Sequence, residues 1–144
     1  MATTKYEAAS IASLATTELN SLATADAALG VEYDNGVGLY FWGDFELLVD
    51  LAVAPAADAP IELYLIPALD GTNYSDGDGT PIAPASSYVG TFFSQAVATV
   101  QRIPLMGIRL PPTKFKALVY NKTGQAFDAT GNVLRMVPIR TQSA

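Results

Sequence analysis

Oxygen-bearing side chains are concentrated in a glycine-rich segment, residues 70–79, and their spacing raises the question of metal binding. Ca²⁺ takes six to eight oxygen ligands. The spacing is not that of an EF-hand, and the Glu that such a loop carries at its twelfth position is missing. Exposed β-turns prefer the same residue types, so a structural loop without a cofactor is expected, with a Ca²⁺ site as the alternative. The candidate ligands are Asp70, Asn73, Asp76 and Asp78.

Side chains suited to acid–base or nucleophilic catalysis are scarce. The chain has no Cys and no His, which excludes thiol nucleophiles, thiolate zinc sites and a Ser-His-Asp triad. The acid pair Asp44 and Glu46, like Asp76 and Asp78 in the loop, has the residue types of a glycosidase centre. Both pairs are expected in solvent, where nothing raises a carboxyl pKa. We therefore expect a protein that is not an enzyme and has no catalytic residues.

The charges are divided between two parts of the chain, whose net charge is −6. Residues 1–101 hold 13 acids and only Lys5, whereas residues 102–144 hold seven bases and only Asp128. Lys114 and Lys116 share one face of a predicted strand and are candidate contacts to a partner. Nucleic acid is not the expected partner, because phosphate binding normally requires a basic domain. The acidic and basic parts are expected to meet, either between copies or within one domain, in a salt-sensitive contact.

From residue 37 onward, apolar and polar residues alternate with the period of two that is typical of half-buried strands. Segments rich in Pro and Gly, such as residues 104–107, separate these runs. Many short strands without an interior helix indicate an all-β antiparallel sandwich over residues 30–144. A jelly roll is the preferred architecture, and an immunoglobulin-like sandwich is the next. The predicted strands are residues 45–53, 61–66, 88–93, 97–103, 114–120 and 133–139.

Residues 1–29 differ in composition and are expected to form an N-terminal arm. Ala and Leu recur there at spacings of three, four and seven, which predicts an extended or partly helical segment that buries little area. Lys5 is followed by no unbroken apolar run, so a signal peptide is not expected. No stretch has the roughly 20 apolar residues that span a bilayer, so no membrane partner is expected. The candidate partner contacts in the arm are Ile11, Leu19 and Leu22.

Aromatic residues gather beside three glycines between residues 33 and 45. Aromatic side chains favour strands, which makes core packing one interpretation. The other is a lectin-like platform or an anchor to another subunit, because Trp and Tyr dominate interface hot spots. Trp42 is the single Trp and the strongest candidate for either role. The cluster consists of Tyr33, Tyr40, Phe41, Trp42 and Phe45.

Two segments carry a resemblance to known proteins. Residues 61–77 read IELYLIPALDGTNYSDG, and residues 110–124 read LPPTKFKALVYNKTG. Together they resemble the small β-sandwich virion proteins of tailed bacteriophages, which include capsid decoration (cement) proteins. The resemblance covers roughly residues 40–140 and transfers no individual functional residue. It implies repeated, symmetric attachment to a capsid or tail, as a homo-oligomer and without a cofactor.

The expected function is therefore that of a virion structural protein, made in the host cytoplasm. A capsid decoration protein that stabilises the shell through multivalent contacts with the major capsid protein is the preferred form. One alternative is a carbohydrate- or receptor-binding module built from Trp42 and residues 70–79. The other is a tail-tube or connector component, because such proteins are also small β domains.

Overall fold

The computed structural model describes residues 3–78 and 82–143, and almost all of its regular structure is strand. Two short 3₁₀ turns, η1 and η2, and the four-residue helix α1 interrupt the strands. No helix among the described residues is long and apolar enough to cross a membrane. The elements are β1 (Thr4–Ala8), β2 (Ala12–Ala15), η1 (Thr17–Leu19), β3 (Asp26–Asp34), α1 (Asn35–Gly38), β4 (Trp42–Val49), β5 (Ala59–Ala68), η2 (Ala85–Ser87), β6 (Tyr88–Ser94), β7 (Gln101–Arg109), β8 (Lys114–Asn121) and β9 (Val133–Ser143).

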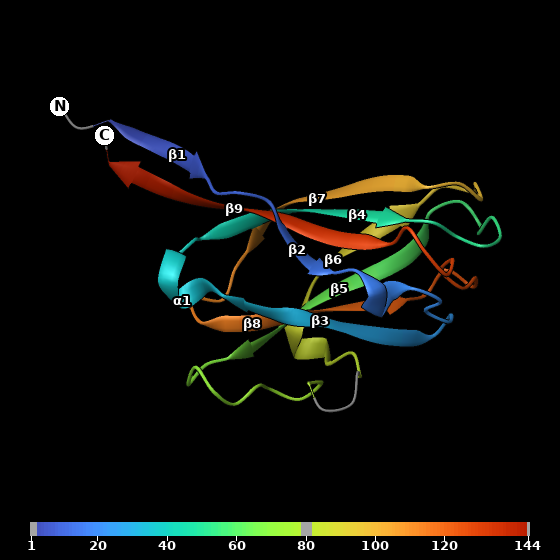
Figure 1. The fold of residues 1–144 in the computed structure, drawn as a ribbon, viewed down its shortest axis with the longest axis horizontal. Coiled ribbons are helices and arrows are strands. Elements are labelled where there is room, and N and C mark those ends of the chain that lie inside the picture. Colours follow the sequence, from blue (N-terminus) through green and yellow to red (C-terminus); the bar gives the residue numbers. More distant parts are fainter. Residues whose placement is uncertain (1–2, 79–81, 144) are drawn as a thin grey trace.

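The strands form two antiparallel sheets that pack face to face (Figure 1). Sheet A has the order β1-β9-β4-β7, with β2 also pairing with β9, and sheet B has the order β3-β8-β5-β6. From β2 to β9 the chain changes sheet at every step except between β5 and β6. The two four-strand layers β2-β9-β4-β7 and β3-β8-β5-β6 therefore have jelly-roll topology. The predicted all-β, jelly-roll-like sandwich is confirmed.

The core lies between the two sheets and follows from the alternation along each strand. In β4, Phe45 and Leu47 point inward and are almost completely buried, whereas the intervening Glu46 stays half-exposed. Sheet B contributes Phe92 and Phe115 to the same core. Burying one large apolar side chain of this kind stabilises the fold by about 1.5–3 kcal/mol. The packed side chains between the sheets therefore hold the two layers together.

Residues 1–29, expected to form an extended or partly helical arm, are mostly extended strand, and most of this segment is built into the sandwich. Ser13 and its neighbours in β2 pair with β9, and β3 begins at Asp26, inside the range expected for the arm. Leu14 contributes to the core as a strand residue. Pairing with β9 supplies the backbone hydrogen bonds that a helix would have made. Only β1 projects away from the sandwich body, as a two-strand ribbon with the end of β9 (Figure 1).

The strand predicted over residues 97–103 lies further along the chain in the structure. The strand β7 begins at Gln101 and continues through residues 104–107, which were expected to be a loop. The strand tolerates Pro104 because β7 is an edge strand that pairs only with β4, so one edge needs no ladder donor. The left-handed φ of Gly107, 69°, accompanies the shift of register between the two strands.

Candidate partner-binding surface

A buried amide fixes the turn between β3 and β4. The Asn35 side chain is fully buried, and its Nδ2 donates to the carbonyl oxygens of Tyr40 (2.8 Å) and Pro111 (2.7 Å). Its Oδ1 accepts from the Tyr40 backbone N–H at 2.9 Å. Asp34 caps the start of α1 by accepting from the Gly36 N–H. These bonds hold Leu39 in the left-handed conformation, with a φ of 51°, which costs a residue with a side chain about 1–2 kcal/mol.

The turn displays apolar side chains outward instead of burying them. Val37 is 85% exposed, Leu39 61% and Phe41 56%. Tyr6, from the ribbon, is 75% exposed and its ring lies 6.1 Å from that of Trp42. The centre of the Phe41 ring lies 5.9 Å from the centre of the Trp42 ring. We call these five residues, Tyr6, Val37, Leu39, Phe41 and Trp42, the apolar end.

Arg140 joins the two parts of the apolar end. Its Nε contacts the Glu7 carboxylate at 2.6 Å, directly across the ribbon from β9 to β1. Its guanidinium lies 5.4 Å from the centre of the Tyr40 ring, and it also donates to the Gly38 carbonyl oxygen at 3.4 Å. The Glu7 carboxylate raises the pKa of Arg140 further. Ribbon and turn are therefore held in one arrangement.

Two shallow hollows adjoin the apolar end. One, of about 260 Å³, lies between Phe41 and Pro112, with Arg109 on its wall. The other, of about 330 Å³, lies on the outer face of sheet A and is lined in part by Ile11 and Met106. Ile11 is 55% exposed, as a candidate contact must be. The apolar surface therefore continues from the end of the sandwich onto sheet A.

The other two candidates from the predicted arm are not available to a partner. Leu19 has no exposed area, and Leu22 is 7% exposed. Both side chains belong to the core cluster between the sheets. Leu19 ends η1 and Leu22 follows it, and together they close one end of the core. The prediction that Leu19 and Leu22 contact a partner is therefore wrong, because both side chains pack in the core.

The acidic and basic parts of the chain meet within one sandwich. Each ion pair of the described residues joins an acid from residues 7–78 to a base from residues 102–140. The cause is topological, because β7, β8 and β9 each pair with strands from the first half of the chain. The pairs are Arg102–Glu46, Lys114–Glu32, Lys116–Asp78, Lys122–Glu62, Arg135–Glu46 and Arg140–Glu7.

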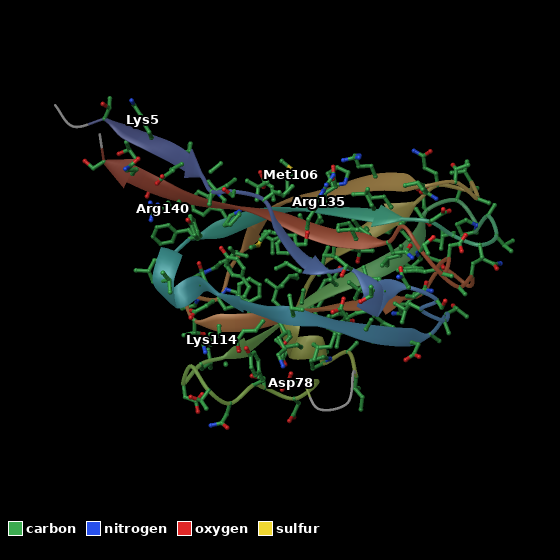
Figure 2. All side chains as sticks on the ribbon, viewed as in Figure 1. Lys5, Asp78, Met106, Lys114, Arg135 and Arg140 are labelled. Carbon is green, nitrogen blue, oxygen red and sulfur yellow. The ribbon has the colours of Figure 1, made fainter. Side chains whose placement is uncertain are left out.

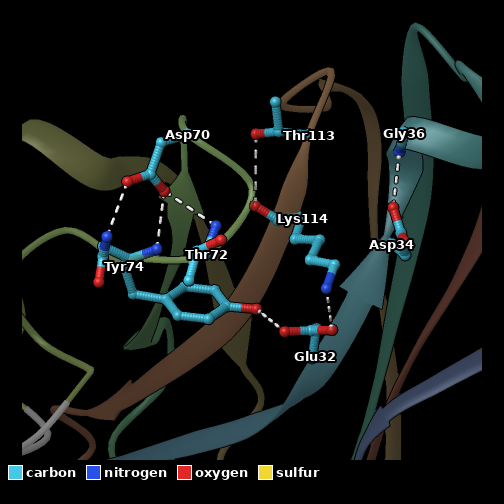
Figure 3. Close-up of polar contacts among 9 residues, drawn as sticks. Glu32, Asp34, Gly36, Asp70, Thr72, Tyr74, Thr113 and Lys114 are labelled. Carbon is cyan, nitrogen blue, oxygen red and sulfur yellow. Dashed lines mark hydrogen bonds and ion pairs between the residues drawn. The ribbon is translucent and has the colours of Figure 1, made fainter.

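Lys114 and Lys116 belong to a charged network on the outer face of sheet B. Figure 2 labels Lys114 and Asp78, and Figure 3 shows Lys114 beside Glu32 and Tyr74. Lys114 lies 3.3 Å from the Glu32 carboxylate, to which the Tyr74 hydroxyl also donates. These bonds, from Tyr74 first and then Lys114, lower the pKa of Glu32. Lys116 contacts Asp78 at 2.5 Å and lies 4.4 Å from the centre of the Tyr74 ring. Both lysines thus hold the loop after β5 against their own sheet.

Three of the four side chains considered as Ca²⁺ ligands, Asp70, Asn73 and Asp78, bond to other partners. Asp70 accepts from the backbone N–H groups of Thr72 (2.8 Å) and Asn73 (2.7 Å) and from the Asn73 side chain (2.8 Å). The Asn73 side chain and these backbone donors lower the pKa of Asp70 to about 2. The Asp78 carboxylate is occupied by Lys116. Asp76 lines a surface hollow beside it, and Gly79 lies outside the described residues. In the described part of the chain, no three acidic side chains are grouped as metal ligands would be.

The acid pair on β4 is also engaged within the chain. Asp44 accepts from the Gly107 backbone N–H at 2.8 Å. Glu46 is bound by Arg102 at 3.0 Å and by Arg135 at 2.5 Å. Cross-strand pairing of opposite charges on a solvent-facing strand accounts for this arrangement. Asp44 and Glu46 therefore link β4 to the neighbouring strands β7 and β9.

The aromatic residues predicted to form one cluster lie in different parts of the structure. Tyr6, which was not predicted to belong with them, lies beside Trp42. Phe45 is in the core and Tyr33 packs on Phe115, whereas Phe41 and Trp42 lie at the apolar end. Trp42 belongs to sheet A, and residues 70–78 contact sheet B, so the two halves of the predicted carbohydrate site lie on different sheets. Tyr6 was missed because its position depends on pairing between the two ends of the chain. The glycines that flank Val37 were the available signal for an exposed turn.

Comparison with known proteins gives no family assignment. No protein-family model matches the chain, and no curated protein matches it.

Proposed function

We propose that the protein is a non-enzymatic virion structural protein, a capsid decoration protein that attaches to the major capsid protein through its apolar end. The supporting observation is the set of exposed side chains on a rigid turn, with Val37 85%, Leu39 61% and Phe41 56% exposed. Apolar side chains gathered at one place on a surface are typical of protein-binding sites. Aromatic residues are also enriched where interfaces derive most of their binding energy.

The fold suits such attachment because the turn is prepared before binding. Asn35 and Arg140 hold the turn and ribbon through bonds within the chain. A surface that is ordered in advance loses little conformational entropy on association. Leu39 stays in a strained backbone conformation, and strain of this kind is typical of functional surfaces. Many such weak contacts on one shell would add through multivalency.

The test is a variant in which the apolar end is made polar without touching the core. We expect Val37→Ser, Leu39→Asn and Phe41→Ser together to lower occupancy on capsids of the cognate phage by about 100-fold, because hot-spot residues contribute more than about 1 kcal/mol each. The thermal stability that the protein gives to the capsid should be lost in parallel. Asn is chosen at position 39 because it tolerates the left-handed conformation.

The matched control is Phe93→Ser, which removes an aromatic ring of similar exposure, 57%, from β6 of the other sheet. It should leave occupancy unchanged. Full occupancy by the triple variant, with its fold verified by circular dichroism, would disprove attachment through the apolar end. Glycan-array binding that depends on Trp42 would instead support the carbohydrate-binding alternative.

A further inference from the structure

In the part of the chain that the structure describes, no strand pairs with the outer edge of β1, the edge that faces away from β9. The Ala9 N–H donates to the Pro138 carbonyl oxygen at 2.9 Å, so the amide of Ala9 faces β9. Backbone groups of successive strand residues alternate between the two edges. Lys5 and Glu7 therefore also face β9, and the N–H and C=O groups of Thr4, Tyr6 and Ala8 face outward. On the neighbouring strand, the Ile139 carbonyl accepts from Phe41 on the β4 side, which agrees with this phase.

The side chains of β1 are self-complementary in charge about the same central residue. The strand reads TKYEA, with Lys5 and Glu7 on either side of Tyr6. In an antiparallel pair of two such strands centred on Tyr6, Lys5 of each copy lies opposite Glu7 of the other. Centring the pair on Lys5 or on Glu7 would instead place like charges opposite each other.

We propose that β1 is the site of self-association, in which two copies of this chain pair antiparallel through their β1 edges about a two-fold axis at Tyr6. The residue pairs Tyr6–Tyr6, Thr4–Ala8 and Ala8–Thr4 exchange about six backbone hydrogen bonds. The Lys5–Glu7 pairs occupy the non-hydrogen-bonded positions, where side chains of opposite strands are closest. Lys5 makes no ion pair with any of the described residues of its own chain, so its charge is available for this contact.

The contact is small, so the isolated dimer is weak. Five residues on each side bury less area than a standard stable interface. Close spacing on a virion surface would raise the effective concentration and populate the pairing. The proposal deepens the proposed function by naming one partner of the ribbon, a second copy. It is tested on the isolated chain, so its failure leaves the capsid contact of the apolar end untouched.

Cysteine cross-linking measures the register directly, because the natural chain contains no Cys. Tyr6→Cys should form a disulfide-linked dimer under mild oxidation, since opposed residues on paired strands have Cα atoms about 5.5 Å apart, within disulfide range. Thr4→Cys and Ala8→Cys should each remain monomeric alone and cross-link when mixed. A Tyr6→Cys variant that forms no dimer, or equal cross-linking by all three variants, would overturn the proposal.

Charge reversal tests the same register without a covalent bond. By sedimentation equilibrium, the natural chain should approach twice its 15.2 kDa mass as its concentration rises toward the millimolar range. Lys5→Glu should weaken this dimer by about tenfold or more, because two attractive cross-strand pairs become repulsive. Lys5→Glu, Glu7→Lys and Arg140→Glu together should restore it, because both the ribbon pair and the intermolecular pairs return with reversed sign. Lys122→Glu, an equal charge change on sheet B, should have no effect. A natural chain that stays monomeric throughout, or no effect of Lys5→Glu, would contradict the proposal.

Discussion

The apolar end and the charged network on the outer face of sheet B differ in whether their exposed side chains have partners within the fold. On sheet B, Lys116 is bound to Asp78, and Lys122 lies 2.9 Å from Glu62. Burial alone would raise the pKa of Glu62, but bonds from Tyr64 and Lys122 lower it overall. At the apolar end, Val37 is 85% exposed and Phe41 56% exposed.

The two surfaces differ in whether their exposed side chains already have partners in the isolated chain. Charged groups on sheet B have their partners within the fold, so another molecule would have to break those contacts in order to bind. The apolar end gains free energy only when something covers it, because apolar area removed from water is worth about 25 cal/mol per Å². Exposed apolar area without an internal partner is therefore the basis of our proposal that the apolar end contacts another protein.

The largest effect is expected from removing the buried amide that supports the apolar end. Asn35→Ala leaves two carbonyl groups and the Tyr40 N–H without their partner, and it should lower the free energy of unfolding by about 2–4 kcal/mol. Urea denaturation measures this change. Asn73→Ala, which removes an exposed amide on the sheet B side, should cost less than about 1 kcal/mol. Equal losses would show that the two surfaces are supported alike.

Replacing the strained residue should separate stability from binding. Leu39→Gly relieves the left-handed conformation and should raise the free energy of unfolding by about 0.5–1 kcal/mol. The same change removes an exposed apolar side chain, so capsid occupancy should fall. Thermal denaturation and a capsid-binding assay on one sample give both values. A variant that loses stability would show that Leu39 contributes packing rather than strain.

Neutralising a lysine on sheet B should have a smaller effect on stability and none on binding. Lys116→Met keeps an apolar stem but removes the ion pair with Asp78 and the contact with the Tyr74 ring. The expected loss is about 0.5–1 kcal/mol by chemical denaturation. Lys122→Met, whose side chain is more exposed, should lose less. A drop in capsid occupancy for either variant would show that sheet B takes part in binding and would contradict attachment through the apolar end.

The smallest expected effect is the change in the free energy of unfolding as Asp70 is protonated at low pH. The pKa of Asp70 is lowered from 3.8 to about 2 in the folded chain, so its ionised form contributes stability that is fully present above its unfolded pKa. That contribution is lost as the pH falls through the folded value. Carboxyl carbon chemical shifts should therefore report a midpoint near 2, and Asp70→Ala should flatten this part of the stability curve. A midpoint near 3.8 would mean that the loop turn does not hold its carboxylate.

Much of the strand pattern was accessible from sequence, for reasons visible in single elements. The alternation from Phe45 to Val49 is strong because one face of β4 packs on the core and the other meets solvent. The strand β7 was harder because Pro104 and Gly107 resemble a loop, and only its position at a sheet edge makes them acceptable. Leu19 and Leu22 had the spacing of a helix, but spacing alone could not show that η1 and the segment after it close one end of the core.

The sequence by itself determined the all-β class, the lack of His and Cys chemistry and the division of charge along the chain. Periodicity and composition are local properties, so these features need no knowledge of distant contacts. Only the tertiary structure decided that the charge division is resolved within one sandwich, because strand order brings β7, β8 and β9 beside early strands. It also decided that Tyr6 lies beside Trp42, since that contact joins opposite ends of the chain through the ribbon.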